Sequence, residues 1–176
     1  MTQYRIFEDQ RIPGPQMFVI DVPDAWDLYD SPLPQAVLSA IEAPSDHYRE
    51  NVLVSVIKAT TVEEVIDLGT RSLLEPDGSG TRNAEVMAEH RVAAEHEDEP
   101  TPAGFRTIQL EVVHDGKTIR LCQTHFAALL PLNFLLAVPR VLAIVATAER
   151  TPDGDPAPSL TRARQLAGAL AFESVA

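Results

Sequence analysis

The chain has 176 residues, with 14 Lys and Arg against 26 Asp and Glu, and a formal net charge of −12. This length predicts one domain over residues 1–176, and the negative charge disfavours nucleic-acid binding or docking on anionic lipid, which need clustered basic side chains. Cys122 is the only cysteine, which excludes an intrachain disulfide and a zinc site built from several cysteines.

The first third of the chain predicts strands. Residues 4–7 and 17–22 are separated by a turn at 13–15, and residues 36–41 and 51–57 follow as further strands. Residues 51–57 are apolar on both sides, which indicates a central strand. The N-terminus lacks the basic start, the apolar stretch and the small-residue cleavage site of an export signal, so we expect a cytoplasmic protein.

A helix is predicted to begin at Thr61, whose hydroxyl suits an N-cap, with Glu64 three residues later in the capping-box arrangement. Its apolar stripe consists of Val62, Val65, Ile66, Gly69 and Leu73. Glycine costs a helix about 1 kcal/mol relative to alanine, so Gly69 suggests a close contact between helix and sheet.

Residues 84–95 alternate between apolar and charged side chains, which predicts a half-buried strand with His90 on its apolar face. We therefore expect His90 to be a buried, hydrogen-bonded structural residue. The alternative is that His90 is the polar group of a ligand pocket between helix and sheet. The acidic segment 95–99 that follows is expected to be a solvated loop, with weak calcium binding as its alternative.

The stretch 108–121 predicts a β-hairpin around Asp115-Gly116, because a two-residue Asp-Gly turn favours positive φ at both positions. The predicted register pairs His114 with Lys117, Leu110 with Leu121, Val112 with Ile119, Glu111 with Arg120, Gln109 with Cys122 and Arg106 with His125. The apolar pairs mark the face toward the core. Cys122 is expected to be a small packing residue, since no base can be assigned beside it.

Residues 141–148 predict the last strand, and Ser159 is expected to cap a final helix whose apolar stripe is Ala163, Leu166, Ala167 and Leu170. The apolar region 126–148 is long enough to cross a bilayer, but Pro131, Asn133, Pro139 and Arg140 interrupt it. Two strands joined by an apolar loop explain it better, so we expect no membrane insertion.

No nucleophile elbow, phosphate-binding glycine loop or dinucleotide fingerprint is present. His90 and His96 would lie about 20 Å apart on one strand, His114 and His125 lie at opposite ends of the hairpin, and His47 lies in a loop with no spacing relation to them. We therefore expect no metal site, and no cofactor or catalytic residue either. The loop 129–138 is apolar where a connection should be polar, which indicates a partner surface. Its candidate residues are Leu132, Phe134, Leu135, Leu136 and Val138. The alternative is that this loop folds onto the core.

The opening Phe18-Val19-Ile20-Asp21-Val22-Pro23-Asp24-Ala25-Trp26 resembles the Phe-x-hydrophobic-x-hydrophobic-Pro-x-x-Trp motif of the Mog1/PsbP-like superfamily. The order of strands, helix, hairpin, strand and terminal helix is also similar. Among relatives, the chain looks most like the actinobacterial LpqN/LpqT group and the DUF1795 proteins, which include chaperone adaptors for secreted effectors. The resemblance implies a binding or adaptor module, and it supplies no catalytic residues to transfer.

The expected fold is α+β, an α/β sandwich with a mainly antiparallel sheet covered by helices. The expected function is a non-enzymatic adaptor or chaperone that binds an unidentified protein and is linked to bacterial secretion. A small-molecule-binding or enzymatic domain with a helix–sheet pocket near His90 is the alternative. A homodimer joined through the apolar loop is the third version.

Overall fold

The computed structural model describes residues 2–6, 17–29, 36–75, 81–91, 103–130, 139–168 and 171–173. The elements are β1 (Thr2–Ile6), β2 (Met17–Val22), β3 (Trp26–Leu28), β4 (Ala36–Glu42), β5 (Asn51–Lys58), α1 (Val62–Leu74), β6 (Thr81–Arg91), β7 (Ala103–His114), β8 (Lys117–Leu129), β9 (Arg140–Glu149), α2 (Pro158–Gly168) and β10 (Ala171–Glu173).

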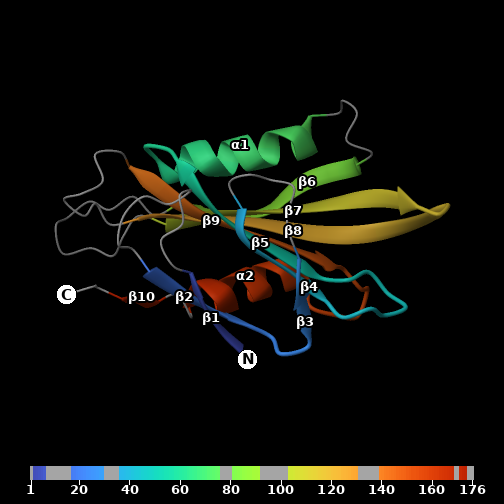
Figure 1. The fold of residues 1–176 in the computed structure, drawn as a ribbon. Helices are drawn as coiled ribbons and strands as arrows, with labels where there is room; N and C mark the ends of the chain where they lie inside the picture. The colour runs from blue at the N-terminus through green and yellow to red at the C-terminus, as the bar shows by residue number, and fades with distance from the viewer. Residues whose placement is uncertain are drawn as a thin grey trace.

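A seven-stranded antiparallel sheet with the order β3-β4-β5-β9-β8-β7-β6 forms the centre of the fold. Helix α1 packs on β6, β7 and β8 from one face, and α2 packs on β8 and β9 from the other (Figure 1). Strand β5 is interior, as its apolar sequence predicts, because β4 and β9 flank it. The predicted α+β sandwich is therefore confirmed.

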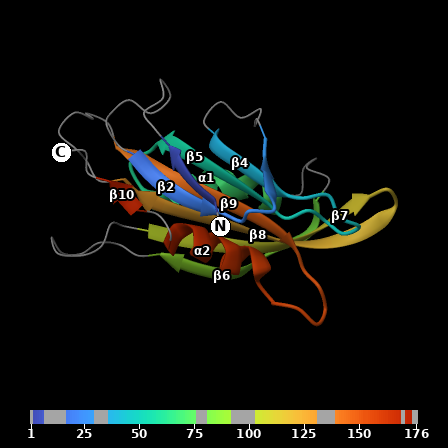
Figure 2. The same cartoon turned by 60° about the horizontal axis from the view of Figure 1, so that its bottom comes forward.

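The second sheet is small, with the order β1-β2-β10, and it lies on the same side as α2. Figure 2 shows β1 and β2 beside α2 over the large sheet. Between β2 and β3 the chain turns at the Pro-x-x-Trp motif, where the Trp26 amide donates to the Pro23 carbonyl at 3.0 Å. Val22 and Trp26 thereby join one core with Val52 and Val54 of β5. Strands β3 and β10 are not predicted by the sequence pattern.

The hairpin of β7 and β8 has the predicted register throughout, from His114 opposite Lys117 to Arg106 opposite His125. Asp115 and Gly116 have φ values of 50° and 74°, as the two-residue turn requires. Alternation along these strands puts Leu110 on the α1 face of the sheet, in a core that includes Leu73 of α1.

Helix α1 begins after Thr61, whose hydroxyl accepts the Glu64 amide at 3.2 Å, as predicted. The reciprocal bond differs from the expected capping box, because the Glu64 carboxylate accepts from the Thr60 amide and hydroxyl, both at 3.2 Å. Val62, Val65 and Ile66 are buried against the sheet. The predicted stripe is therefore the contact face of this helix.

Strand β6 departs from the prediction in its extent and in its burial. It begins at Thr81, and Val86 and His90 on the supposed apolar face are both exposed, Val86 by 45%. Two register shifts along β6 break the alternation, and among the described strands β6 is an edge strand paired with β7. The expectation of a buried His90 is wrong for this reason.

Helix α2 begins at Pro158, which suits the first helical turn because proline lacks an amide hydrogen that would stay unpaired there. Ser159 is thus inside the helix and not its cap. Its buried hydroxyl contacts Thr124 Oγ1 at 2.9 Å and donates to Cys122 Sγ at 3.0 Å. Cys122 is fully buried under α2, and burial raises the pKa of its thiol. The predicted packing role of Cys122 is confirmed.

Strands β8 and β9 flank the apolar connection as predicted. The candidate partner residues in that connection, Leu132, Phe134, Leu135, Leu136 and Val138, lie outside the described residues, as does the acidic segment 95–99. Within the described ranges, no helix has the length and apolar character needed to cross a membrane.

Candidate functional site

A groove of about 430 Å³ lies between α1 and the large sheet. Helix α1 packs mainly on β6, β7 and β8, so the groove opens beside the helix over β5, β9 and β8. Its lining is formed by Leu53, Ser55, Ile57, Val65, Ile66, Leu68, Gly69, Ser72, Leu73, Gln123, His125, Phe126, Ala127, Ala143 and Val145. Most of these side chains are apolar, and the few polar ones include a histidine.

His125 projects from β8 beneath α1 and is 8% exposed. Its Nε2 lies 3.1 Å from the Oε1 of Gln123, whose amide nitrogen donates to Thr147 Oγ1 at 2.9 Å. Because Gln123 offers its oxygen, Nε2 carries the proton of the neutral ring and Nδ1 is left as an acceptor. Burial, assisted by the nearby positive charge of Arg106, lowers the pKa of His125 to about 4.

Gly69 brings α1 close to this histidine. A Cβ at position 69 would lie only 2.6 Å from His125 Nδ1, well inside van der Waals contact. The glycine on the apolar stripe of α1 thus has a steric reason, as the sequence suggested. It lets the helix backbone lie close to the ring.

We expect Gly69→Ala to lower the free energy of unfolding by about 1 kcal/mol, although alanine favours a helix by about the same amount. The clash with His125 costs about 1–3 kcal/mol and outweighs the gain, because the ring is buried and held by Gln123. Urea unfolding would measure this difference. Ser72→Ala on the same helix is the control and should be neutral or stabilising; a stabilised Gly69→Ala would contradict the close contact.

Arg106 fastens α1 to the edge of the sheet and is 8% exposed. Its Nη1 lies 2.8 Å from both Asp67 Oδ1 and Thr70 Oγ1 on α1, and its Nη2 lies 2.8 Å from Glu89 Oε1 on β6. The guanidinium therefore joins α1 to the edge strand β6. It lies on one side of His125, and the strands β5 and β9, over which the groove opens, lie on the other side. This charge also disfavours a proton on His125.

His90 is not among the residues that line the groove. It lies on the opposite face of the sheet, where its ring is 6.0 Å from that of Phe105. The histidine that sequence reasoning missed is His125. Its signal was in the hairpin register, which places it on the same face as Leu121, and in the glycine of the α1 stripe.

The arrangement suits binding better than proton transfer. A general base works best with a pKa near the working pH, and a pKa of about 4 makes His125 a weak base at neutral pH. The His125 Nε2 hydrogen is already given to Gln123 rather than to a hydroxyl nucleophile. The groove thus offers an apolar surface with a small number of neutral hydrogen-bonding groups.

The large sheet, with α1 on one face and α2 on the other, defines a Mog1/PsbP-like fold, and solved structures agree. LpqN of Mycobacterium tuberculosis, described as involved in cell envelope biogenesis, matches with a TM-score of 0.57 and 13% identity over 98% of this chain and 91% of LpqN. The cyanobacterial PsbP (CyanoP) of Synechocystis sp. PCC 6803 matches with a TM-score of 0.50 and 10% identity over 97% of this chain and 92% of CyanoP.

These identities are low, so the likeness concerns the fold alone. The sequence matches no family model and no curated protein. The fold resemblance drawn from the Pro-x-x-Trp opening and the element order is confirmed.

Proposed function

We propose that the chain, as one Mog1/PsbP-like domain over residues 1–176, is a non-enzymatic binding module that holds an apolar group between α1 and the sheet. The observation that carries the proposal is the groove of about 430 Å³ with an apolar lining and a neutral histidine. Ligand sites are commonly concave, mostly apolar and about 300–1,000 Å³ in volume, with a few polar groups that orient the ligand.

The ligand that fits has an apolar body and a small polar group. Leu53 and Val145 face each other across β5 and β9, and both are half-buried in the groove. They form an apolar wall opposite α1. Ser55, Ser72 and Gln123 are polar residues of the lining besides His125, and they can hydrogen-bond a polar group of the ligand. A charged ligand group is disfavoured, because a charge in an apolar site without a partner is costly.

The test uses the neutral fluorescent dye N-phenyl-1-naphthylamine, with 1-decanol as competitor. Wild type is expected to bind the dye and to release it to decanol. The double variant Leu53→Gln/Val145→Gln should bind at least about tenfold more weakly, because two apolar contacts of roughly 1 kcal/mol each are lost. Val113→Gln is the control, since Val113 is 47% exposed near the hairpin turn. No saturable binding, or equal binding by the double variant, would reject the proposal.

The adaptor version is the second candidate, in which the apolar group belongs to a partner protein. Leu68 favours it, because this residue of α1 borders the groove and is 62% exposed. The comparison with LpqN, which is involved in cell envelope biogenesis, is compatible with a non-enzymatic role. In the adaptor version a protein co-purified on wild type is released by decanol and is lost in Leu53→Gln/Val145→Gln. A captured protein that decanol leaves bound would argue against use of the groove.

A further inference from the structure

Arg120, in the first part of β8, lies next to Arg150, which directly follows β9, on the face of the sheet opposite α1. The pairing of Leu121 with Glu149 continues outward to Arg120 and Arg150, and the Arg150 amide donates to the Arg120 carbonyl at 2.8 Å. Like charges directly opposite on neighbouring strands destabilise a sheet. The whole chain has a net charge of −12, but these two arginines repel each other, and a bound anion would offset that repulsion.

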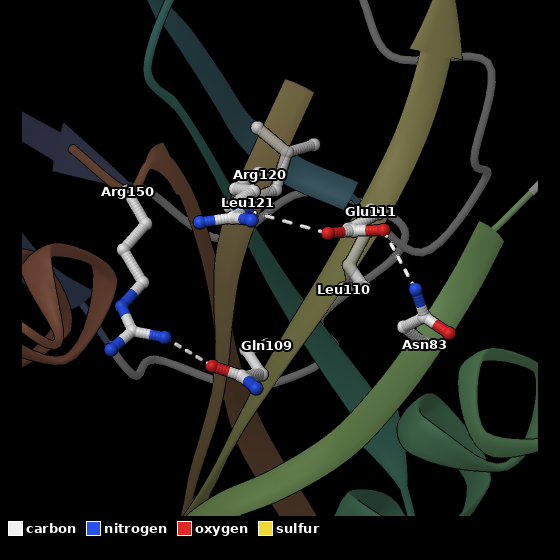
Figure 3. A pocket seen from close by; sticks show the side chains of 7 residues that line it. All are labelled: Asn83, Gln109, Leu110, Glu111, Arg120, Leu121 and Arg150. Carbon is white, nitrogen blue, oxygen red and sulfur yellow. Dashed lines mark hydrogen bonds and ion pairs between the residues drawn. The ribbon is translucent and has the colours of Figure 1, made fainter. Parts of the chain in front are cut away.

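Neighbouring side chains hold both guanidinium groups, and in the described part of the chain one carboxylate, that of Glu111, is bonded to the pair, so a net positive charge remains. Arg150 donates to the amide oxygen of Gln109, whose own nitrogen donates to Glu85, so the partner of Arg150 is a neutral group. Arg120 is paired through Nε with Glu111 at 3.3 Å, and Asn83 donates to the other oxygen of Glu111 at 2.7 Å. Figure 3 shows the bonds of Arg150 to Gln109 and of Arg120 and Asn83 to Glu111, with the two guanidinium groups on the same cleft.

The free donors of the pair face solvent-accessible clefts. The Arg120 side chain is 70% exposed, and within the described part of the chain only its Nε has a bonded partner. Arg120 and Arg150 are shared by two adjoining clefts of about 210 and 290 Å³. The first is the polar cleft over β6, β7 and β8; the second is bordered by Thr151, Pro152, Gly154 and Pro156.

We infer that Arg120 and Arg150 form a binding site for a small organic oxyanion, a carboxylate or a phosphate ester. A guanidinium presents parallel N–H donors that match two oxygens of either group. The cleft over β6, β7 and β8 is smaller than a typical drug-sized pocket, so it holds the oxyanion group. The adjoining cleft holds the small organic part of the same ligand. This site is separate from the groove beneath α1 and does not depend on it.

The experiment titrates wild type with inorganic phosphate and, in a separate arm, with acetate. Chloride keeps the ionic strength constant, and the arginine Nε–Hε resonances and the melting temperature are followed. We expect saturable shifts of the Arg120 and Arg150 resonances and a raised melting temperature; the stronger of the two arms identifies phosphate or carboxylate as the ligand group. Arg150→Gln and Arg120→Gln should each weaken binding at least about tenfold.

Arg71→Gln provides the matched control, because Arg71 is exposed in the last turn of α1, on the opposite face, and its loss changes the net charge equally. It should bind as wild type does. Without added oxyanion, Arg150→Gln should melt no lower than wild type, because a like-charge contact is removed. Three results would each overturn the site: no saturable response in either arm, an unchanged response in Arg120→Gln/Arg150→Gln, or equal weakening by Arg71→Gln.

Discussion

Acidification from pH 7 to pH 4 is expected to remove about 3 kcal/mol of the free energy of unfolding through His125 alone. The folded state lowers the pKa of this ring from 6.5 to about 4, by burial first and by the Arg106 charge second. Between these pH values the unfolded chain binds a proton that the folded chain does not. Stability is therefore complete above about pH 6.5, falls as the pH decreases, and stops falling through this group below about pH 4.

Urea unfolding of wild type and His125→Gln at several pH values between 7 and 4 would isolate this contribution, since carboxylates titrate in both proteins. The difference between the two should change by up to about 1.4 kcal/mol per pH unit. His114→Gln is the control, because that histidine is at the hairpin turn with a side chain 77% exposed. If wild type and His125→Gln lost stability in parallel, the neutral buried state of His125 would be refuted.

The hairpin and α1 could be predicted because their signals are local. Asp115-Gly116 specifies a turn, the turn specifies the register, and the register assigns each side chain to a face. Thr61 and Glu64 likewise mark a helix start within four residues. The prediction of strand β6 was less accurate. Its register shifts near Asn83 and Val86 and its place at the sheet edge depend on its pairing with β7, which the local sequence does not specify.

The groove itself is assembled from distant parts of the chain. Along the chain, the end of α1, the strands β6 and β7 and the hairpin turn lie between Gly69 and His125. The packing of α1 on β8 brings the two residues together. Ser159 is another example. A serine suits either an N-cap or a buried hydrogen bond, and here the tertiary contact with Thr124 gives it the buried hydrogen bond. His90 is exposed because the edge strand does not keep the alternation that its sequence predicts.

The two faces of the large sheet differ in how completely they are covered. The face toward α2 carries the larger core, in which Val54, Leu142 and Ile144 are fully buried with Leu166 of α2. The face toward α1 is left partly open at β5 and β9, where Leu53 and Val145 line the groove. Alternating residues of the same two strands therefore form the buried core on one side and line the groove on the other.

Ile144→Ala should consequently cost about 2–5 kcal/mol of unfolding free energy, because a large side chain with no exposed surface is cut back and its neighbours close the cavity only in part. Ile144→Val should cost only about 0.5–1.5 kcal/mol. Both variants should bind N-phenyl-1-naphthylamine like wild type well below their melting temperatures, since Ile144 faces α2 and the next residue, Val145, faces the groove. If Ile144→Ala weakened dye binding as much as Leu53→Gln/Val145→Gln does, the separation of the two faces would be wrong. If Ile144→Ala lowered the free energy of unfolding by less than Ile144→Val does, the place of Ile144 in the core would be refuted.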